Sequence, residues 1–322
     1  MDTAQRALVT TLGPASLHLA SEIAQAGATA FRLNASHMTV KDLVAALRSL
    51  QQASLHIPVV ADLQGAKMRL GTFEPLPLQP GSSLKLTLAP GIHTIPLPHP
   101  ELFQAVRKGD TLSCDDDRVR LGIEHVGATS IRARSLVAGV LRPRKGVNVL
   151  EHPVDLTDLT KQDIAQLEAA ANHPDVSFAC SFMRDGRESS WIRSRQPSAK
   201  VIGKVERAEA IAAMDSIARQ VDEIWICRGD LGAQLGLPEL ARWLADFDPR
   251  RFGIPVFIAG QVLEHLTHHA DPTRSEVCHL YDLLRRGFDG VVLSDETAVG
   301  ADPVRAAATA RRLMDALCTP GA

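Results

Sequence analysis

The chain has 322 residues, of which 45% are hydrophobic, and a formal net charge of −2. This length and apolar content suffice for one large α/β domain with room for a smaller insertion. The near-neutral charge argues against a general nucleic-acid-binding protein, and no uninterrupted apolar stretch reaches the length that spans a membrane. The N-terminus lacks a basic region followed by an apolar segment, so we expect no secretion signal and a cytoplasmic protein.

Short β-rich runs alternate with longer helical patterns along the chain. The predicted strands are Ala7–Thr11, Ala28–Arg32, Ile57–Ala61, Val176–Cys180, Val201–Gly203, Glu223–Cys227, Pro255–Ala259 and Gly290–Leu293. The predicted helices are Leu17–Ala26, Val40–Leu55, Lys161–Ala171, Arg207–Gln220, Pro238–Asp246, Thr273–Arg286 and Asp302–Leu317. This alternation is typical of a (β/α)8 TIM barrel, an α/β fold whose functional sites lie at the carboxyl ends of the strands.

Between Leu70 and Arg144 the pattern changes to proline-rich turns and alternating segments such as Ser83–Thr87. This alternation predicts a small antiparallel, β-barrel-like domain inserted after the third barrel strand. We therefore expect residues 1–69 and 145–322 to form the barrel and residues 70–144 to form the insertion. Such a domain could act as a lid that closes on a substrate and excludes water.

Polar and glycine residues follow seven of the eight predicted strands. In chain order they are Arg32, Asn34 and Ser36; Asp62; Ser181 and Arg184; Lys204 and Glu206; Arg228 and Asp230; Gly260 and Gln261; and Ser294 and Glu296. Because parallel strands deliver their carboxyl ends to one rim, these residues should lie together. Taken singly, Lys204 with Glu206 and Arg32 with Asp62 could be structural ion pairs. The recurrence of charged residues at strand ends favours a functional site.

The most informative of these groups is Lys204 with Glu206, followed at the next strand end by Asp230. Two carboxylates and one ammonium at a single rim could hold a divalent metal against a phosphate or an enolate. The sequence therefore indicates metal-assisted chemistry on a small anionic substrate.

A series of collinear segments resembles the successive signatures of the pyruvate kinase family. They are Thr11–Ser16, Arg32–His37, Asp62–Arg69, Asp115–Asp116, Lys145–Asn148, Ser181–Arg184, Lys204–Glu206, Arg228–Gly232, Pro272–Arg274 and Glu296–Ala298. Several motifs in order over nearly the whole chain are far more specific than one motif. The resemblance implies a diverged member with a (β/α)8 barrel as its A domain, the insertion as its B domain and an active site between them. The family's C-terminal domain is expected to be absent, because the sequence stops just after the last predicted helix, which ends at Leu317.

The resemblance also implies a reaction, phosphoenolpyruvate plus ADP to pyruvate plus ATP, that depends on Mg²⁺ or Mn²⁺. Glu206 and Asp230 would ligate the metal, Lys204 would stabilise charge on the transferring phosphoryl group and the enolate, and Arg32 would contact phosphate. Backbone N–H groups of the turn at Arg228, Gly229 and Asp230 would bind the substrate carboxylate. Further substrate-binding candidates are Ser181 and Gly260, and the nucleotide and lid candidates are His37, Asp116, Lys145 and Arg69.

A monovalent-ion site is a weaker expectation. Asn34, Ser36 and Asp62 match potassium ligands of the family, and Lys67 lies where the family carries glutamate or lysine. Lysine there goes with members that do not need potassium, because its ammonium supplies the positive charge of the ion. We therefore expect K⁺ not to be required, although a plain structural lysine is an equal alternative.

One departure from the family pattern affects the expected reaction. Gly260 stands where the family has a threonine whose hydroxyl touches the substrate beside the face on which the enolate is protonated. Loss of a positioned polar group in such a site lowers the rate by about a hundredfold or more. Further departures lie at Met38, Arg207, Cys278, His279 and Asp295.

Gly260 leaves two alternatives to phosphotransfer open. In one, a diverged enzyme stabilises a pyruvate-like enolate as an aldol lyase, as a decarboxylase or in enolpyruvyl chemistry. In the other, the protein is a non-catalytic sensor that binds phosphoenolpyruvate. The expected partners are phosphoenolpyruvate, pyruvate or a related 2-oxo acid, with ADP or ATP, and neither nucleic acid nor a membrane. The barrel domain could also mediate a homo-oligomer.

Overall fold

The chain forms two compact units. The computed structural model describes residues 6–318 except residues 54, 116, 172 and 174. Residues 1–66 and 158–322 belong to the first unit, and residues 67–157 to the second. Each unit has its own hydrophobic core. The segment predicted as an insertion, residues 70–144, lies within the second unit.

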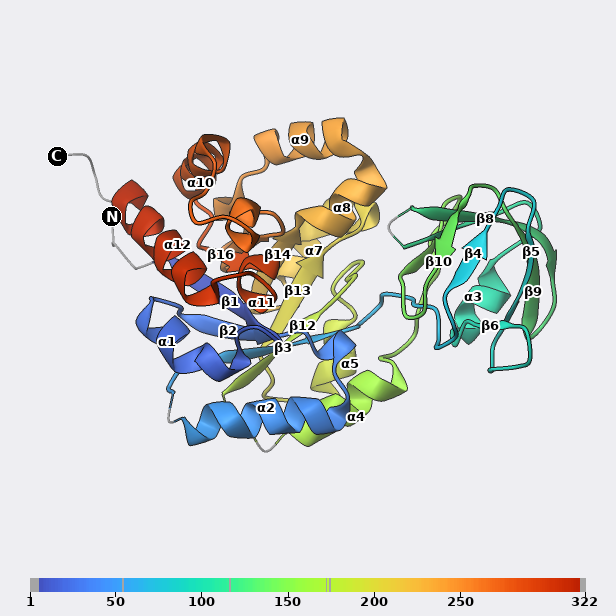
Figure 1. Cartoon of the computed structure of the whole chain (residues 1–322), viewed down its shortest axis with the longest axis horizontal. Coiled ribbons are helices and arrows are strands. Elements are labelled where there is room, and N and C mark those ends of the chain that lie inside the picture. Colours follow the sequence, from blue (N-terminus) through green and yellow to red (C-terminus); the bar gives the residue numbers. More distant parts are fainter. Residues whose placement is uncertain (1–5, 54, 116, 172, 174, 319–322) are drawn as a thin grey trace. The chain divides into compact units, whose positions relative to one another are not determined.

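The first unit is a closed barrel of parallel strands (Figure 1). Its strand order is β1-β16-β15-β14-β13-β12-β3-β2, so β1 closes the ring by pairing with both β2 and β16. The strands are β1 Ala7–Leu12, β2 Ala30–Leu33, β3 Val59–Leu63, β12 Val176–Cys180, β13 Val201–Val205, β14 Glu223–Cys227, β15 Val256–Ala259 and β16 Gly290–Leu293. The predicted TIM barrel is confirmed.

Helices surround this barrel (Figure 1). They are α1 Ala20–Gln25, α2 Val40–Gln52, α4 Lys161–Ala170, α5 Ser189–Arg193, α6 Ala208–Ala212, α7 Met214–Ala218, α8 Arg228–Leu235, α9 Leu237–Asp246, α10 Arg274–Arg286, α11 Asp295–Ala298 and α12 Pro303–Cys318. Short 3₁₀ helices lie at η1 Leu17–Leu19, η2 Ala35–His37, η3 Pro249–Phe252 and η4 Glu264–Thr267. No helix of the described residues is long and apolar enough to cross a membrane.

Local sequence explains where three of the longer helices begin. Thr39, Thr160 and Thr273 each cap a helix through a reciprocal capping box with the acidic residue three positions later, which satisfies backbone N–H groups that have no partner inside the helix. The prediction was wrong over Arg207–Gln220, where two short helices replace the single helix. The chain turns at Ala213, whose N–H bonds to Ala210 only three residues back.

The second unit consists mainly of antiparallel strands. Its main sheet has the order β11-β7-β8-β9-β5-β6, and β4 pairs with β10 in a smaller sheet. The elements are β4 Leu76–Leu78, β5 Ser83–Thr87, β6 Ile95–Pro96, α3 Pro100–Ala105, β7 Thr111–Cys114, β8 Val119–Val126, β9 Ser130–Ser135, β10 Gly139–Leu141 and β11 Val147–Val149. Alternate residues of β9 are buried and exposed, as expected for a strand with one face on a core.

The amino end of β14 carries a largely buried carboxyl group, Glu223, which accepts a hydrogen bond from the indole N–H of Trp225. Burial raises the pKa of Glu223 to about 7, against an ordinary value of 4.5. The folded state therefore holds a proton that the unfolded chain releases. The free energy of unfolding should fall as the pH rises from about 4.5 to about 7.

We expect unfolding in urea to show this loss between about pH 5 and about pH 8, with a contribution of about 2 to 3 kcal/mol from Glu223. The Glu223→Gln variant should lack that component, because its amide stays neutral over the whole range. Glu239→Gln, at an exposed position, is the matched control and should keep the pH dependence of the parent protein. An equal pH dependence in parent and Glu223→Gln would contradict the assignment.

Candidate active site

Strand alternation brings a set of polar side chains to the carboxyl end of the barrel. Residues that fill the barrel interior include Val9, Val60, Ala179 and Ile202. Because side chains two positions apart point to the same face, the residues two positions further along those strands also face inward. They are Thr11, Asp62, Ser181 and Lys204, and Arg32 follows from Ala30 in the same way.

Asp62 is the centre of this cluster. Its carboxylate is almost fully buried, at 1% exposure. Its Oδ2 accepts from Arg32 Nε at 2.7 Å and lies 3.0 Å from Lys204 Nζ. Its Oδ1 accepts from the Ser181 hydroxyl at 3.1 Å. Both carboxylate oxygens are therefore engaged by side chains from three other strands or strand ends.

Lys204 lies between two carboxylates. Its Nζ is 3.0 Å from Glu206 Oε1 as well as 3.0 Å from Asp62 Oδ2, and it donates to Ser181 Oγ at 2.9 Å. Glu206 is held on its other oxygen, because Oε2 accepts from the backbone N–H of Phe182 at 2.8 Å. Phe182 adopts a left-handed backbone with φ 57°, which is unusual for a bulky residue and directs this N–H.

The electrostatics of the cluster favour the charged forms of Lys204 and Asp62. Burial by itself would lower the pKa of Lys204, but Asp62 and Glu206 outweigh burial and raise that pKa above its ordinary value. Burial would raise the pKa of Asp62, but Lys204 and Arg32 outweigh it and hold that pKa below its ordinary value. Lys204 is thus a permanent cation suited to stabilising charge, and it is not a general base at neutral pH.

The chemistry of the donor set suits a divalent metal. Among the described residues, no group of three or more His, Cys, Asp or Glu side chains could by itself hold a metal ion. Mg²⁺, however, is commonly held by one or two carboxylates together with substrate oxygens and water. Glu206 follows β13, and Asp230 lies in the first turn of α8 after the neighbouring strand β14. The two predicted ligands therefore follow neighbouring strands and are of the donor type that Mg²⁺ takes together with substrate oxygens.

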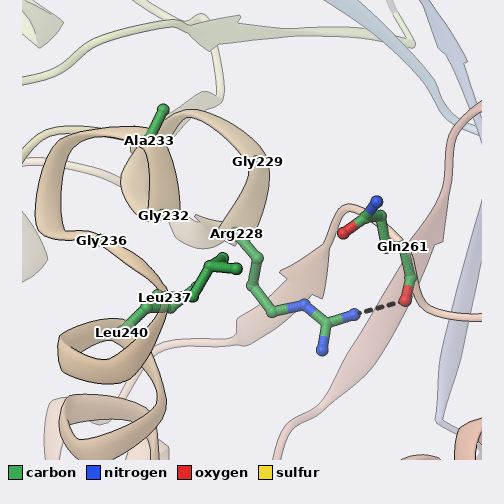
Figure 2. A pocket seen from close by; sticks show the side chains of 8 residues that line it. All are labelled: Arg228, Gly229, Gly232, Ala233, Gly236, Leu237, Leu240 and Gln261. Atoms are coloured by element: carbon green, nitrogen blue, oxygen red, sulfur yellow. Dashed lines mark hydrogen bonds between the residues drawn. The ribbon is translucent and has the colours of Figure 1, made fainter. Parts of the chain in front are cut away.

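Arg228, a predicted substrate-binding residue, makes its side-chain contacts with the turn after β15. It donates from Nε and Nη2 to the Gly260 carbonyl at 2.9 and 2.6 Å. Its Nη2 also donates to the Gln261 carbonyl at 2.8 Å (Figure 2). Its Nη1 lies 2.6 Å from Nε2 of His279. A pocket of about 400 Å³ opens beside these groups, lined by Arg228, Gly229, Gly232, Ala233, Gly236, Leu237, Leu240 and Gln261.

The backbone of Gly260 differs from that of an ordinary residue. Its φ is +85°, and a Cβ atom built on it would lie 3.3 Å from the backbone N of Gly229. Gln261 also has a positive φ of 55°. A threonine at position 260 would be strained in this conformation and would crowd the Gly229 amide.

The remaining predicted site residues lie at different places in the two units. Asn34, half-buried, accepts from the Ser36 hydroxyl at 2.8 Å, and His37 ends η2 at an exposed position. Lys67, Arg69 and Lys145 belong to the second unit. Lys145 Nζ lies 3.0 Å from Asp115 Oδ1 there. The predicted Asp116 lies outside the described residues.

Sequence reasoning did not assign roles to two buried residues of the rim. Thr11 Oγ1 accepts from Arg32 Nη1 at 2.9 Å and donates to the Leu293 carbonyl at 2.7 Å, so it orients the guanidinium. Glu296 accepts backbone N–H groups from Ser294 at 2.7 Å and Leu263 at 3.2 Å, so it ties β16 to the loop after β15. Both belong to segments noted in the sequence. The signal was their position, because Thr11 lies near the carboxyl end of β1 and Glu296 follows β16.

Known proteins share this organisation of the sequence. A family model described as pyruvate kinase, barrel domain, matches residues 3–307. A protein of Agrobacterium vitis named pyruvate kinase is 33% identical over 323 residues, which cover 96% of this chain and 68% of that protein. A pyruvate kinase of Aeropyrum pernix is 32% identical over 313 residues, which cover 92% of this chain and 68% of that protein.

The chain belongs to the pyruvate kinase family. The range matched by the family model, residues 3–307, includes residues of both units. Another relative, a pyruvate kinase of Methylorubrum extorquens, is 32% identical over 323 residues, which cover 96% of this chain and 67% of that protein. The pyruvate kinase resemblance inferred from the motifs is thereby confirmed.

Proposed function

We propose that this pyruvate kinase family member is a divalent-metal-dependent phosphotransferase that converts phosphoenolpyruvate and ADP to pyruvate and ATP. The observation that carries the proposal is the buried ammonium of Lys204, held by Asp62, Glu206 and Ser181 at the carboxyl end of the barrel. Burying this cation costs free energy that packing alone would avoid, and a fixed cation at a catalytic rim stabilises a developing anion.

Charge balance supports a metal in this site. Arg32 and Lys204 carry two positive charges, and Asp62 and Glu206 carry two negative charges, so the buried cluster is neutral. A substrate with a phosphate and a carboxylate therefore needs further positive charge. Mg²⁺ or Mn²⁺, held by Glu206 and Asp230, would supply it by polarising substrate oxygens.

The protein groups have separate roles in this proposal. Lys204 stabilises negative charge on the phosphoryl group and on the enolate, and Arg32, fixed by Asp62 and Thr11, binds phosphate. The first amides of α8, at Gly229 and Asp230, bind the substrate carboxylate, because N–H groups in a first helical turn have no partner inside the helix. Gly229 is exposed, and a Cβ added to it would meet nothing within 4 Å, which leaves its amide accessible.

Several finer expectations belong to the same proposal. Contacts of His37, Asp116, Arg69 and Lys145 with the nucleotide remain predictions, as do the independence from K⁺ and a cytoplasmic location. Asp62, a predicted potassium ligand, has protein partners on both carboxylate oxygens. Oδ2 contacts Arg32 and Lys204, and Oδ1 accepts from the Ser181 hydroxyl. This supports a site in which protein charges replace a monovalent cation.

A second candidate is enolate chemistry on another 2-oxo acid. The positive φ of Gly260 and its close approach to the Gly229 amide favour this second reaction. The backbone at position 260 has a conformation in which a threonine would be strained. Such a reaction would use the same metal and Lys204, since both stabilise an enolate.

The test is NMR of the purified chain with Mg²⁺. We expect the phosphorus signal of phosphoenolpyruvate to give way to those of ATP when ADP is present, and we expect EDTA to abolish the conversion. Separately, the methyl proton signal of pyruvate is followed in D₂O. Loss of the methyl signal without ATP formation would contradict phosphotransfer and favour enolate chemistry on another 2-oxo acid. Binding of phosphoenolpyruvate with neither ATP formation nor loss of the methyl signal would favour the sensor.

A further inference from the structure

Arg228 is a cation held only by neutral groups. Its contacts are the carbonyls of Gly260 and Gln261 and the imidazole of His279, and among the described residues it forms no ion pair. The contacts join three elements: α8, the turn after β15 and helix α10. The turn they hold has two successive residues with positive φ, Gly260 and Gln261.

The contact with His279 defines the protonation state of that ring. A guanidinium carries five N–H donors and no acceptor. At 2.6 Å from Arg228 Nη1, Nε2 of His279 must therefore offer a lone pair. The imidazole is neutral with its proton on Nδ1, because an imidazolium would place two N–H donors against each other.

The turn that Arg228 holds faces the proposed carboxylate site. A Cβ atom on Gly260 would lie 3.3 Å from the Gly229 backbone N. A movement of the Gly260–Gln261 turn would therefore change the room that a ligand has beside the Gly229 amide. Arg228 is thus the link between His279 on α10 and the first amides of α8. Figure 2 shows the guanidinium reaching from α8 to the Gln261 carbonyl.

We propose that neutral His279 is a positioning residue that, through Arg228, holds the Gly260–Gln261 turn in place over the substrate-carboxylate site, and that its protonation releases the turn. The proposal rests on the proposed function for the identity of the substrate. The latch itself, defined as His279, Arg228 and the carbonyls of Gly260 and Gln261, is a property of the free protein.

The charged groups around the latch favour the neutral ring. Burial, then Arg228 and Arg286, lower the pKa of His279, and Asp282 on the same helix raises it. Burial also lowers the pKa of Arg228, and Glu296 on α11 and Glu264 on η4 act in the opposite direction on that pKa. His279 therefore stays neutral to a lower pH than an ordinary histidine, and the latch opens only as the pH falls through that lowered value.

The experiment compares three variants of the full chain. His279→Gln keeps an acceptor oxygen and cannot be protonated, whereas His279→Leu has no acceptor. His56→Gln, at an exposed position at the amino end of the barrel, is the matched control. The first readout is the amide NMR signals of Gly260 and Gln261 in the free protein as the pH is lowered.

We expect these two signals to shift with the titration of His279 in the parent protein and in His56→Gln, and to be insensitive to pH over that range in His279→Gln. Signals that do not follow His279 would overturn the proposal, whatever the enzyme's substrate. This readout needs no turnover, so it separates failure of the latch from failure of the proposed function.

The second readout is pyruvate binding with Mg²⁺, measured by saturation-transfer NMR, together with KM and kcat for phosphoenolpyruvate. His279→Leu should raise KM about tenfold at neutral pH, since it removes one hydrogen bond to a charged group. His279→Gln should stay within about threefold and lose the acid decline of kcat/KM. If Gln and Leu lower the melting temperature alike and leave KM and the pH profile unchanged, His279 is merely structural and the proposal is wrong.

Discussion

Replacing Lys204 by methionine is expected to lower the rate of phosphoryl transfer by about a hundred- to a thousandfold, as loss of one preorganised group that stabilises a transition-state charge does in other enzymes. Methionine keeps most of the length of the side chain and removes only the ammonium. The reason for the large effect is that Nζ is fixed by Asp62, Glu206 and Ser181 in a buried site. No solvent molecule replaces a cation oriented in this way. The measurement is the initial rate of ATP formation per folded molecule, with folding followed by circular dichroism.

The matched control is Lys200→Met. Lys200 is exposed and precedes the same strand, β13, at its opposite end, so its loss should leave the rate within about twofold. A Lys204→Met variant that retains the parent rate would show that the ammonium is a structural ion-pair partner. The proposed reaction would then lose the support of the Lys204 ammonium.

Replacing Asp62 by asparagine is expected to lower the free energy of unfolding by about 3 to 5 kcal/mol, the cost of leaving buried charges without their partner. The carboxylate lies within 3.0 Å of both Arg32 and Lys204, and it is 1% exposed. The neutral variant leaves Arg32 without a carboxylate partner and leaves Lys204 with Glu206 alone. Because the folded-state pKa of Asp62 is lowered, its contribution should be complete above about pH 4 and should be lost only as the pH falls below that value.

Urea unfolding at neutral pH measures this effect. Asp271→Asn is the control. Asp271 is 80% exposed and forms a surface ion pair of 3.6 Å with Arg305, and such a pair contributes about 0 to 1 kcal/mol to the free energy of unfolding. The double variant Asp62→Asn, Arg32→Gln should recover part of the lost stability, since it also removes the cation that loses its carboxylate partner. A loss below about 1 kcal/mol in Asp62→Asn would mean that solvent screens the cluster.

The sequence predicted the barrel and its functional rim because both depend on local patterns. Alternating strand and helix signals identified each barrel strand within a few residues, and capping residues such as Thr160 and Thr273 marked helix starts. Since the fold type follows from this alternation, Lys204, Glu206 and Asp230 could be placed at one end of the barrel without coordinates. Local signals did not separate α6 from α7, and they did not reveal α8, whose start reads as a glycine-containing turn.

The ion pairs Arg32 with Asp62 and Lys204 with Glu206 were already candidates from the sequence, and the tertiary structure alone decided that the two pairs join in one cluster. Asp62 and Ser181 are separated in the sequence by the entire second unit, but they meet because β3 pairs with β12 in a register that sets Asp62 opposite Ala179. Lys204 joins them because β13 is the next strand in the barrel. From sequence, Asp62 was assigned to a monovalent-ion site, and its partnership with Lys204 was not foreseen. Strand order and register bring together residues that are remote in the chain, and the spacing of residues along the sequence does not specify which of them meet.

In the same way, His279 was noted only as a departure from the family pattern. Its contact with Arg228 spans 51 positions and depends on how α10 packs beside the barrel. The sequence by itself determined the fold and the family, and it indicated the rim for which we propose the chemistry, because periodicity and motifs are local. The neutral cluster around Asp62 and the latch at Arg228 were decided by packing, because ion pairs and hydrogen bonds of about 3 Å require contacts that only the folded chain makes.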